Sequence, residues 1–414
     1  MANPKQVGFN KAGGSKKVSR DLTYQHTFKN IIPGDVCIAL EHTLEQLKLE
    51  FDEITHVKER MFGDPVEIPF IRYQADDGTE VPFGSYYVKG IGEIHPTYDA
   101  YPTPQIIIEG NLESKSHQTK AKWDELIALT AERAKHVSIF RGKAIKVLNP
   151  HDLLVPSYMD LTDDVEIFLN ADLEDKLETC LFWPLMNRDS VRELGMPSKF
   201  GVILEGYYGA GKSLLLYKAA RVAYASGWGV LHVGPGMVNV AMLVGKLLEP
   251  VCILVEDIDL STHGDRDSLT ALINSISSVT TKANQDYAIV VSTNFIDRID
   301  PALLRPDRFD RLIKIELPDQ DTVTRMLKAT AGNVLGDATA AVPELVDKTP
   351  AIVAEIIKRC KIDVKRKGGK ITAEMIISHL KSMQRQVELA MPEYRKGTSA
   401  DRLYDELVAA TNQS

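Results

Sequence analysis

The chain lacks the features of a secreted or membrane protein. Its 414 residues include only four cysteines, and no two of them form a C-x-x-C pair. This argues against a disulfide framework and against a zinc site, and it favours free thiols in a reducing compartment. No apolar run approaches the ~20 residues that span a bilayer, and the N-terminus has no apolar signal-peptide core. We therefore expect a cytoplasmic protein without a membrane partner.

The composition is that of an ordinary globular protein, with 44% hydrophobic and 26% charged residues. The length predicts two to three domains. A net charge of −8 argues against a protein that grips nucleic acid with its whole surface. Residues 1–20 are nevertheless basic, and the sequence predicts a disordered tail there, with binding to nucleic acid as the alternative. Its cations are Lys5, Lys11, Lys16, Lys17 and Arg20.

Residues 21–150 predict an α+β domain that contacts a substrate or partner, since they contain no catalytic motif. Apolar residues spaced by three and four predict one amphipathic helix over 35–60. Strands are expected over 66–73 and 81–88, with a hairpin turn at 75–79 between them. Further predicted elements are a strand over 105–109, a helix over 123–135, and a strand, turn and strand over 138–147.

One stretch carries a specific chemical signal. Val202-Ile203-Leu204 predicts a buried strand, residues 206–213 match G-x-x-x-x-G-K-[ST], and helix formers follow from Leu214. Strand, glycine loop and helix together indicate a phosphate-binding loop. The candidate nucleotide-binding residues are Gly206, Tyr207, Tyr208, Gly209, Ala210, Gly211, Lys212, Ser213 and Leu214.

The chemistry of a nucleotide explains this spacing. Glycines allow backbone N–H groups to surround a phosphate, and the helix directs its positive end to the same anion. Lys212 would place a charge on the β- and γ-phosphates, and the Ser213 hydroxyl would be a Mg²⁺ ligand. ATP and Mg²⁺ are therefore the expected cofactors. Ile167 and Phe168 either form an apolar wall for adenine or belong to the core.

The chain beyond this loop alternates strands and helices, which predicts a doubly wound parallel sheet. The strand at 251–255 ends in Glu256 and Asp257, of which one can support the Mg²⁺ water shell and the other can polarise water. Asn294 ends the next buried strand and could hold the attacking water or the γ-phosphate. We predict an α/β ATPase core over 151–319, an α-helical lid over 320–390 and a tail over 391–414.

These motifs, in this order, resemble those of the AAA+ ATPases, in the branch of protein unfoldases and remodellers. The resemblance extends from Leu161 to Arg385 and rests on the phosphate loop, the ILVEDID segment, the STN segment and the DPALLRPDRFDR segment. It implies a homo-oligomeric ring, usually a hexamer, with ATP bound between subunits. It also implies that Asn294 is the sensor-1 residue and that Arg305 and Arg308 are arginine fingers that reach the neighbouring subunit.

The chain departs from the family pattern in several places. The family usually ends the Walker B strand with Asp-Glu, whereas this chain has Glu256-Asp257. A similar order occurs in the AAA protein of the mitochondrial inner membrane that translocates a folded iron–sulfur subunit. By position, Asp257 is assigned as the base and Glu256 as the Mg²⁺-shell group. Asp307 replaces a glycine between the two arginines. The segment 237–250 has no aromatic pore residue, and 349–352 has no sensor-2 arginine.

Three functional hypotheses follow. The first is an ATP-hydrolysing, ring-forming, chaperone-like protein that remodels or translocates a macromolecular client, with protein as the favoured client. The second is an ATP-gated assembly or scaffold protein with slow turnover, which the short pore segment favours. The third is a nucleic-acid-dependent ATPase that uses the basic tail.

Overall fold

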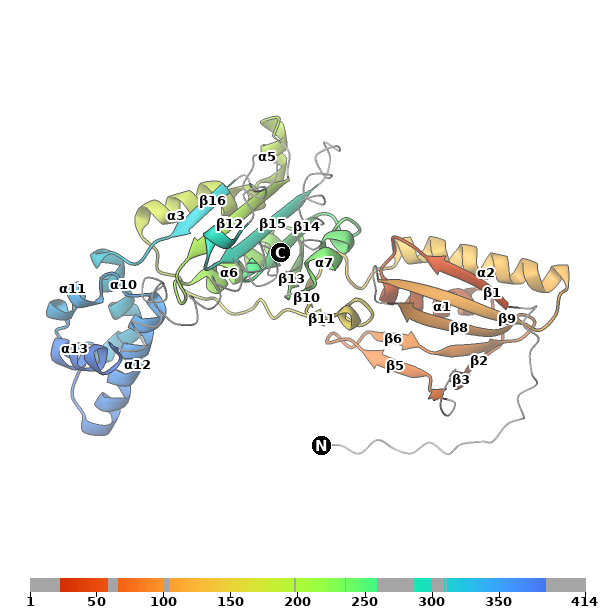
Figure 1. The fold of residues 1–414 in the computed structure, drawn as a ribbon, viewed down its shortest axis with the longest axis horizontal. Coiled ribbons are helices and arrows are strands. Elements are labelled where there is room, and N and C mark those ends of the chain that lie inside the picture. The colour runs from red at the N-terminus through yellow and green to blue at the C-terminus, as the bar shows by residue number, and fades with distance from the viewer. Residues whose placement is uncertain are drawn as a thin grey trace, which may run out of the picture. The chain divides into compact units, whose positions relative to one another are not determined.

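The computed structural model describes residues 23–58, 66–99, 104–196, 199–234, 236–258, 286–299, 309 and 311–384. These fall into two compact units (Figure 1). The first extends to Ser138, and the second begins at Ile139 and also includes Ala75–Asp77. The predicted basic tail, the predicted helix over 267–278, the DPALLRPDR segment and the C-terminal tail lie outside the described residues. None of the described helices combines the length and the apolar character needed to cross a membrane.

The first unit is built on a five-stranded antiparallel sheet with the order β1-β9-β8-β7-β2. Two helices accompany it, and Trp123 of the second helix packs so closely on Gly110 of β9 that a Cβ there would lie 2.4 Å from its ring. The elements are β1 (Thr23–Phe28), α1 (Pro33–Gln46), β2 (Phe51–Ile54), β3 (His56–Lys58), β4 (Val66–Ile68), β5 (Ile71–Gln74), β6 (Glu80–Phe83), β7 (Ser85–Val88), β8 (Gly92–Asp99), β9 (Gln105–Leu112) and α2 (His117–His136).

The single helix predicted over 35–60 is wrong in its second half. Helix α1 ends at Gln46, and Lys48 takes a left-handed conformation with φ +52°. The Leu49 amide then donates to the Leu44 carbonyl, 3.1 Å away. The chain continues as β2, in which Phe51 pairs with Val88 of β7. Pairing with a neighbouring strand therefore outweighs the helical spacing of the apolar residues.

The predicted hairpin at 75–79 is confirmed, because β5 and β6 pair antiparallel on either side of it. Of the strand, turn and strand predicted over 138–147, only the second strand forms, as β10 (Ala144–Val147), and it does not belong to the first unit. It pairs in parallel with β13 (Gly229–Val233) of the second unit. The boundary that the sequence predicts at 150 therefore cuts off one strand of the seven-stranded sheet of the second unit.

The second unit contains the predicted doubly wound sheet, with the strand order β11-β10-β13-β14-β15-β12-β16. All neighbours are parallel except β11, which is antiparallel to β10. The strand β12 lies between β15 and β16. The chain runs from β12 to β13, β14 and β15, all on one side of β12, and then crosses to β16 on its other side. The remaining strands are β11 (Ser157–Tyr158), β12 (Phe200–Gly206), β14 (Val251–Val255), β15 (Tyr287–Thr293) and β16 (Arg311–Ile315).

Helices complete this α/β core (Figure 1). The strands are nearly all apolar because both faces are covered, as is usual for a parallel sheet. One face packs on α6, which contributes the fully buried Leu215 and Ala219 to the core. The helices are α3 (Ala171–Leu177), a π-turn (Glu178–Phe182), α4 (Trp183–Met186), α5 (Arg188–Glu193), α6 (Lys212–Ala225) and α7 (Val238–Gly245).

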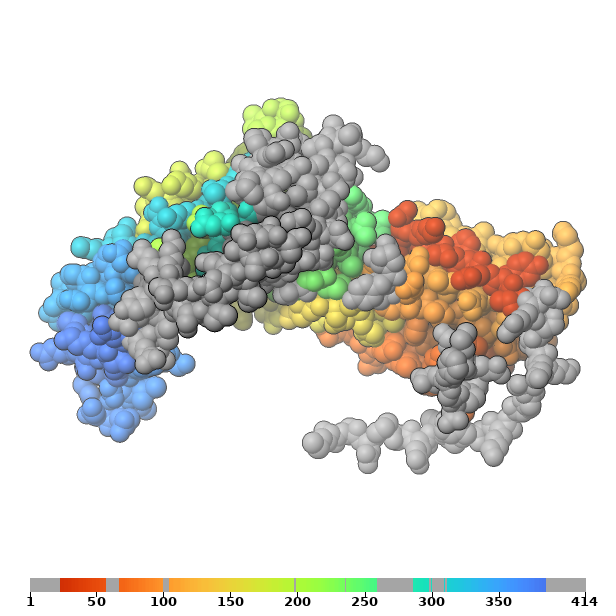
Figure 2. All heavy atoms as spheres, in the orientation of Figure 1, coloured from red at the N-terminus to blue at the C-terminus, as the bar shows by residue number. Residues whose placement is uncertain are grey.

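A helical lid follows the last strand, as the sequence predicts. Its helices have an apolar core of their own, and its atoms form one closely packed lobe (Figure 2). Asp319 caps the first helix by accepting a hydrogen bond from the Thr322 amide at 2.8 Å. The helices are α10 (Gln320–Ala331), α11 (Val342–Leu345), α12 (Pro350–Lys367) and α13 (Ala373–Ser382).

Candidate functional site

The glycine loop joins β12 to α6 with the backbone geometry that the motif predicts. Gly209 and Gly211 have φ values of +77° and +99°, which side chains disfavour. A Cβ on Gly209 would also lie only 2.8 Å from Cβ of Ala351 in the lid. The Ala351 amide donates to the Gly209 carbonyl at 3.2 Å. The loop therefore needs glycine both for its turn and for its contact with the lid.

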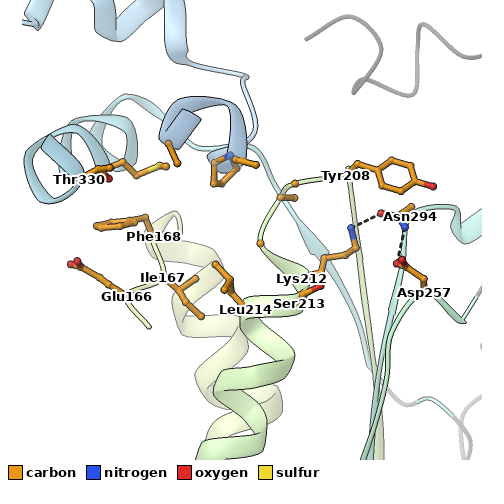
Figure 3. A pocket seen from close by; sticks show the side chains of 17 residues that line it. Glu166, Ile167, Phe168, Tyr208, Lys212, Ser213, Leu214, Asp257, Asn294 and Thr330 are labelled. Atoms are coloured by element: carbon orange, nitrogen blue, oxygen red, sulfur yellow. Dashed lines mark hydrogen bonds between the residues drawn. The ribbon is translucent and has the colours of Figure 1, made fainter. Parts of the chain in front are cut away.

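Lys212 begins α6 and is only 6% exposed. Its ammonium donates to the carbonyls of Gly206 and Tyr207, both at 2.9 Å. It also donates to Oδ1 of Asn294 at 2.7 Å (Figure 3). These contacts hold a buried positive charge at the loop, and a phosphate bound there would replace one of the three oxygens around the ammonium.

Asn294 links Lys212 to the second carboxylate of the Walker B pair. Its Nδ2 donates to Oδ1 of Asp257 at 2.8 Å (Figure 3). Asp257 has φ +44°, a conformation that Asp tolerates better than most residues. Its amide donates to the Ser292 hydroxyl at 3.1 Å. The turn after β14 therefore holds the Asp257 carboxylate beside Asn294, at the carboxyl ends of two neighbouring strands.

Glu256 lies on the other side of the loop. Its Oε2 accepts a hydrogen bond from the Ser213 hydroxyl at 2.8 Å, and its Oε1 lies 3.0 Å from Nε2 of His232. The hydrogen bond with His232 is the main reason why the pKa of Glu256 is lowered, and the bond from Ser213 contributes too. Glu256 is therefore a carboxylate at neutral pH and is available as an oxygen ligand.

The oxygens of Ser213 and Glu256 suit Mg²⁺, which prefers hard oxygen ligands and keeps several waters. Among the described residues, no group of three or more His, Cys, Asp or Glu could hold a metal. Such a pair fits an ion that takes its remaining ligands from phosphate and water, and a dedicated protein cage is not required.

A cavity of about 480 Å³ extends from this loop to the lid (Figure 3). Its core side includes Ile167 and Phe168, which are the two residues predicted as an adenine wall. Both are half-buried, and Ile167 packs against the core of the sheet while Phe168 packs against that of the lid. The lining residues are Glu166, Ile167, Phe168, Tyr208, Gly209, Ala210, Gly211, Lys212, Ser213, Leu214, Asp257, Asn294, Met326, Thr330, Pro350, Ala351 and Ala354.

Most of the residues predicted for the site meet in one place. Seven of the nine loop residues line the cavity, together with Asp257 and Asn294. Gly206 and Tyr207 contribute the carbonyls that bind Lys212, and Tyr207 packs against the core of the sheet. Arg305 and Arg308, the predicted arginine fingers, lie outside the described residues.

Sequence reasoning missed two parts of the site. His232 lies near the carboxyl end of β13, the strand next to β14, and polar residues at such strand ends are a general signal for ligand sites. The second part is in the lid. Pro350 and Ala351 lie in the segment compared above with sensor 2, whereas Met326, Thr330 and Ala354 carry no local signal, because only the packing of the lid brings them to the cavity.

Comparison with known proteins agrees with this geometry. Residues 202–317 match the family described as "ATPase family associated with various cellular activities (AAA)". This segment is an AAA domain. It contains the phosphate loop, both Walker B carboxylates and Asn294, so the predicted resemblance is confirmed on the motifs that carried it.

Curated relatives of the AAA domain include several proteasome-activating nucleotidases. That of Methanoregula boonei is 31% identical over 186 residues, which make up 40% of this chain and 42% of the relative. That of Sulfurisphaera tokodaii is 26% identical over 265 residues, or 58% of this chain and 66% of the relative. That of Saccharolobus solfataricus is 33% identical over 157 residues, or 33% and 39%. The chain thus spans less than two thirds of the length of these relatives.

Proposed function

We propose that the protein is an ATPase that binds Mg²⁺-ATP in the cavity between the AAA core and the lid. The observation that carries this proposal is the bond chain Lys212–Asn294–Asp257 beside the pair Ser213–Glu256, all at one end of a phosphate loop. Bound Mg²⁺ would neutralise charge on the phosphates, with Ser213 and Glu256 as its protein ligands.

Each side chain then has a defined task. Lys212 neutralises phosphate oxygens, and Asn294 fixes the position of Asp257. The Asp257 carboxylate accepts a proton from the attacking water, since its neighbour Glu256 is engaged with Ser213. Residues 166–168 and the lid enclose the adenine ring of ATP and exclude water from it. Arg305 and Arg308 would supply positive charge to the site of a neighbouring subunit, which is worth ~10³–10⁵ in rate in related phosphoryl-transfer enzymes.

We propose further that the chain forms a homo-oligomeric ring, hexameric by resemblance, and remodels a protein client. The proteasome-activating nucleotidases that match it support this choice of family branch. In this proposal the first unit, which ends at Ser138, selects the client, the core hydrolyses ATP, and the lid over 320–390 changes its angle to the core. The cysteines, which are free in the structure, support a cytoplasmic location.

The segment 237–250 favours a second candidate, the ATP-gated assembly protein. Family members that thread their clients carry an aromatic residue there, whereas here α7 buries nearly all of its apolar side chains. Sδ of Met242 accepts a hydrogen bond from the Tyr287 hydroxyl at 3.1 Å, which joins α7 to β15 of the sheet. Of its large apolar residues, Leu243 is exposed, at 41%. Such a helix offers little to grip a chain.

Phosphate release and sedimentation, measured together, test these proposals. We expect the purified chain to release phosphate from Mg²⁺-ATP and to sediment as a ring when ATP is present. Stimulation of turnover by an unfolded protein would support the remodeller, whereas slow turnover with ATP-dependent assembly would support the second candidate. A chain that stays monomeric and releases no phosphate at any concentration contradicts both.

A further inference from the structure

His232 has no task in the proposed reaction, although it lies directly beside the metal-binding carboxylate. It is on β13 and pairs in register with Leu254 of β14, two residues before Glu256. Side chains alternate along a strand, so His232, Leu254 and Glu256 are directed to the same side of the sheet. That side carries α6 and the phosphate loop, because Leu254 packs in the same apolar cluster as Leu215.

The contacts of His232 define its tautomer. An ionised carboxylate only accepts hydrogen bonds, so Nε2 of His232 donates to Oε1 of Glu256 across their 3.0 Å. The other ring nitrogen, Nδ1, is buried and has no hydrogen-bond partner among the described residues. Nε2 therefore carries the proton of this contact, and a proton on Nδ1 would be buried without an acceptor among the described residues.

Glu256 needs such a partner more than an aspartate would. Glutamate has one more rotatable bond than aspartate, and the Glu256 side chain is 39% exposed. Its Oε2 reaches Ser213, and its Oε1 would be free to rotate away without His232. Asp257 is held differently, by Asn294 on one side and by its own strained backbone on the other. The reversed Glu-Asp order thus comes with a separate support for the longer residue.

We propose that His232 is a positioning residue that fixes the Glu256 carboxylate, so that Oε2 faces Ser213 and the Mg²⁺ ion. This inference rests on the proposed function, because it assumes that the site takes Mg²⁺-ATP. Outer partners of metal ligands typically change metal affinity by about 10–100-fold when they are removed.

Two substitutions at His232 separate the effect of the N–H donor from the effect of the volume of the ring. His232→Phe keeps the ring and removes the N–H group, whereas His232→Gln keeps an N–H donor at a similar reach. The dissociation constant of a fluorescent ATP analogue is measured with Mg²⁺ and again with a chelator. The ratio of the dissociation constant in chelator to that in Mg²⁺ reports how much the metal contributes to binding. We expect His232→Phe to reduce this ratio about 10-fold or more and to leave the metal-free constant unchanged. His232→Gln should restore most of the ratio.

The matched control is His379→Phe. His379 lies 2.9 Å from Asp363 in the lid and is exposed to about the same extent as His232, 23% against 24%. The His379→Phe variant should leave the ratio unchanged, and thermal unfolding of each variant shows whether that variant folds.

A His232→Phe variant that keeps the wild-type ratio overturns the inference, as does a His232→Gln variant whose ratio is as low as that of the His232→Phe variant. If the wild-type chain itself binds no ATP analogue, the proposed function fails instead. If it binds the analogue equally with and without Mg²⁺, the assignment of Glu256 to the metal fails, and the role of His232 with it.

Discussion

The two units use their polar residues in opposite ways. In the first unit, polar side chains satisfy one another: Arg72 contacts Glu41 and Glu53, and the buried His95 lies 2.9 Å from the Ser85 hydroxyl. In the second unit, polar side chains gather around a cavity at one edge of a sheet. The arrangement of strands explains the difference, because parallel strands bring all their carboxyl ends together, whereas antiparallel strands alternate. We therefore expect nucleotide chemistry in the second unit and a structural or recognition role in the first.

The severest test of this comparison removes the central cation of the cavity. Lys212→Ala deletes a buried ammonium with three oxygen partners and leaves bound phosphates without their charge. Charge-assisted hydrogen bonds are worth about 1.5–3 kcal/mol each, so we expect ATP affinity to fall by at least about 100-fold. Titration calorimetry measures this loss. The control is Lys89→Ala, which removes an exposed cation that pairs with Glu50 in the first unit. Equal affinity of both variants for ATP would contradict our placement of the site.

The next test separates binding from turnover. Asp257→Asn removes the charge of the proposed base, but its amide oxygen can still accept the hydrogen bond from Asn294. General bases contribute about 10²–10⁴ in rate, and we expect a loss of that size in phosphate release with ATP affinity kept within about 3-fold. Asp189→Asn, an exposed carboxylate on α5, serves as control. Full turnover by the Asp257→Asn variant would transfer the role of base to Glu256.

A smaller effect is expected from the contact between the loop and the lid. Gly209→Ala places a Cβ in a left-handed conformation and within 2.8 Å of Ala351. Relief of this contact displaces the loop from the shape that surrounds the phosphates, and a displacement that costs about 1.4 kcal/mol on binding lowers ATP affinity about 10-fold. Gly195→Ala is the matched control, because Gly195 also has a positive φ, +72°, but has open space around it. If the two substitutions weaken binding equally, the packing of the lid on the loop does not matter.

The last test concerns the first unit and should not change ATP hydrolysis at all. Burial, assisted by the nearby His56, lowers the pKa of His95 from its ordinary 6.5 to about 4. In the unfolded chain His95 therefore binds a proton below pH 6.5, whereas in the folded unit it binds that proton only below about pH 4. The contribution of His95 to the free energy of unfolding is fully present above pH 6.5. It falls with a slope in pH between 6.5 and about 4, by at most about 3 kcal/mol in total. Urea unfolding probed by proteolysis, with the peptides of each unit counted separately, measures this slope.

The His95→Gln variant should show a flatter slope because it cannot be protonated, whereas His136→Gln, at an exposed position of α2, should behave like the wild-type chain. A slope that survives the His95→Gln substitution would show that another group titrates, and a matching change in phosphate release would break the separation of the two units.

Local sequence determined the parts of this protein that depend on short segments. The phosphate loop, the strand before it, the helix after it and the carboxylates that end β14 can all be read from adjacent residues, because backbone geometry and hydrophobic runs impose them locally. The doubly wound sheet followed from the alternation of strands and helices, and the structure confirms it. The role proposed for Lys212 follows the prediction from its place in the motif. For Asn294 the sequence predicted contact with the attacking water or the γ-phosphate, and only the structure shows its hydrogen bond to Asp257.

Tertiary structure decided what depends on distant segments meeting. It ended α1 at Gln46, because the next residues pair better as a strand beside β7 than as further helical turns. It moved residues 144–147 from the predicted first domain into the sheet of the second unit, between β11 and β13. It placed His232 beside Glu256 and the lid over the glycine loop, although no local pattern marks either contact. In each case the deciding free energy comes from partners far away along the chain, which a local pattern cannot contain.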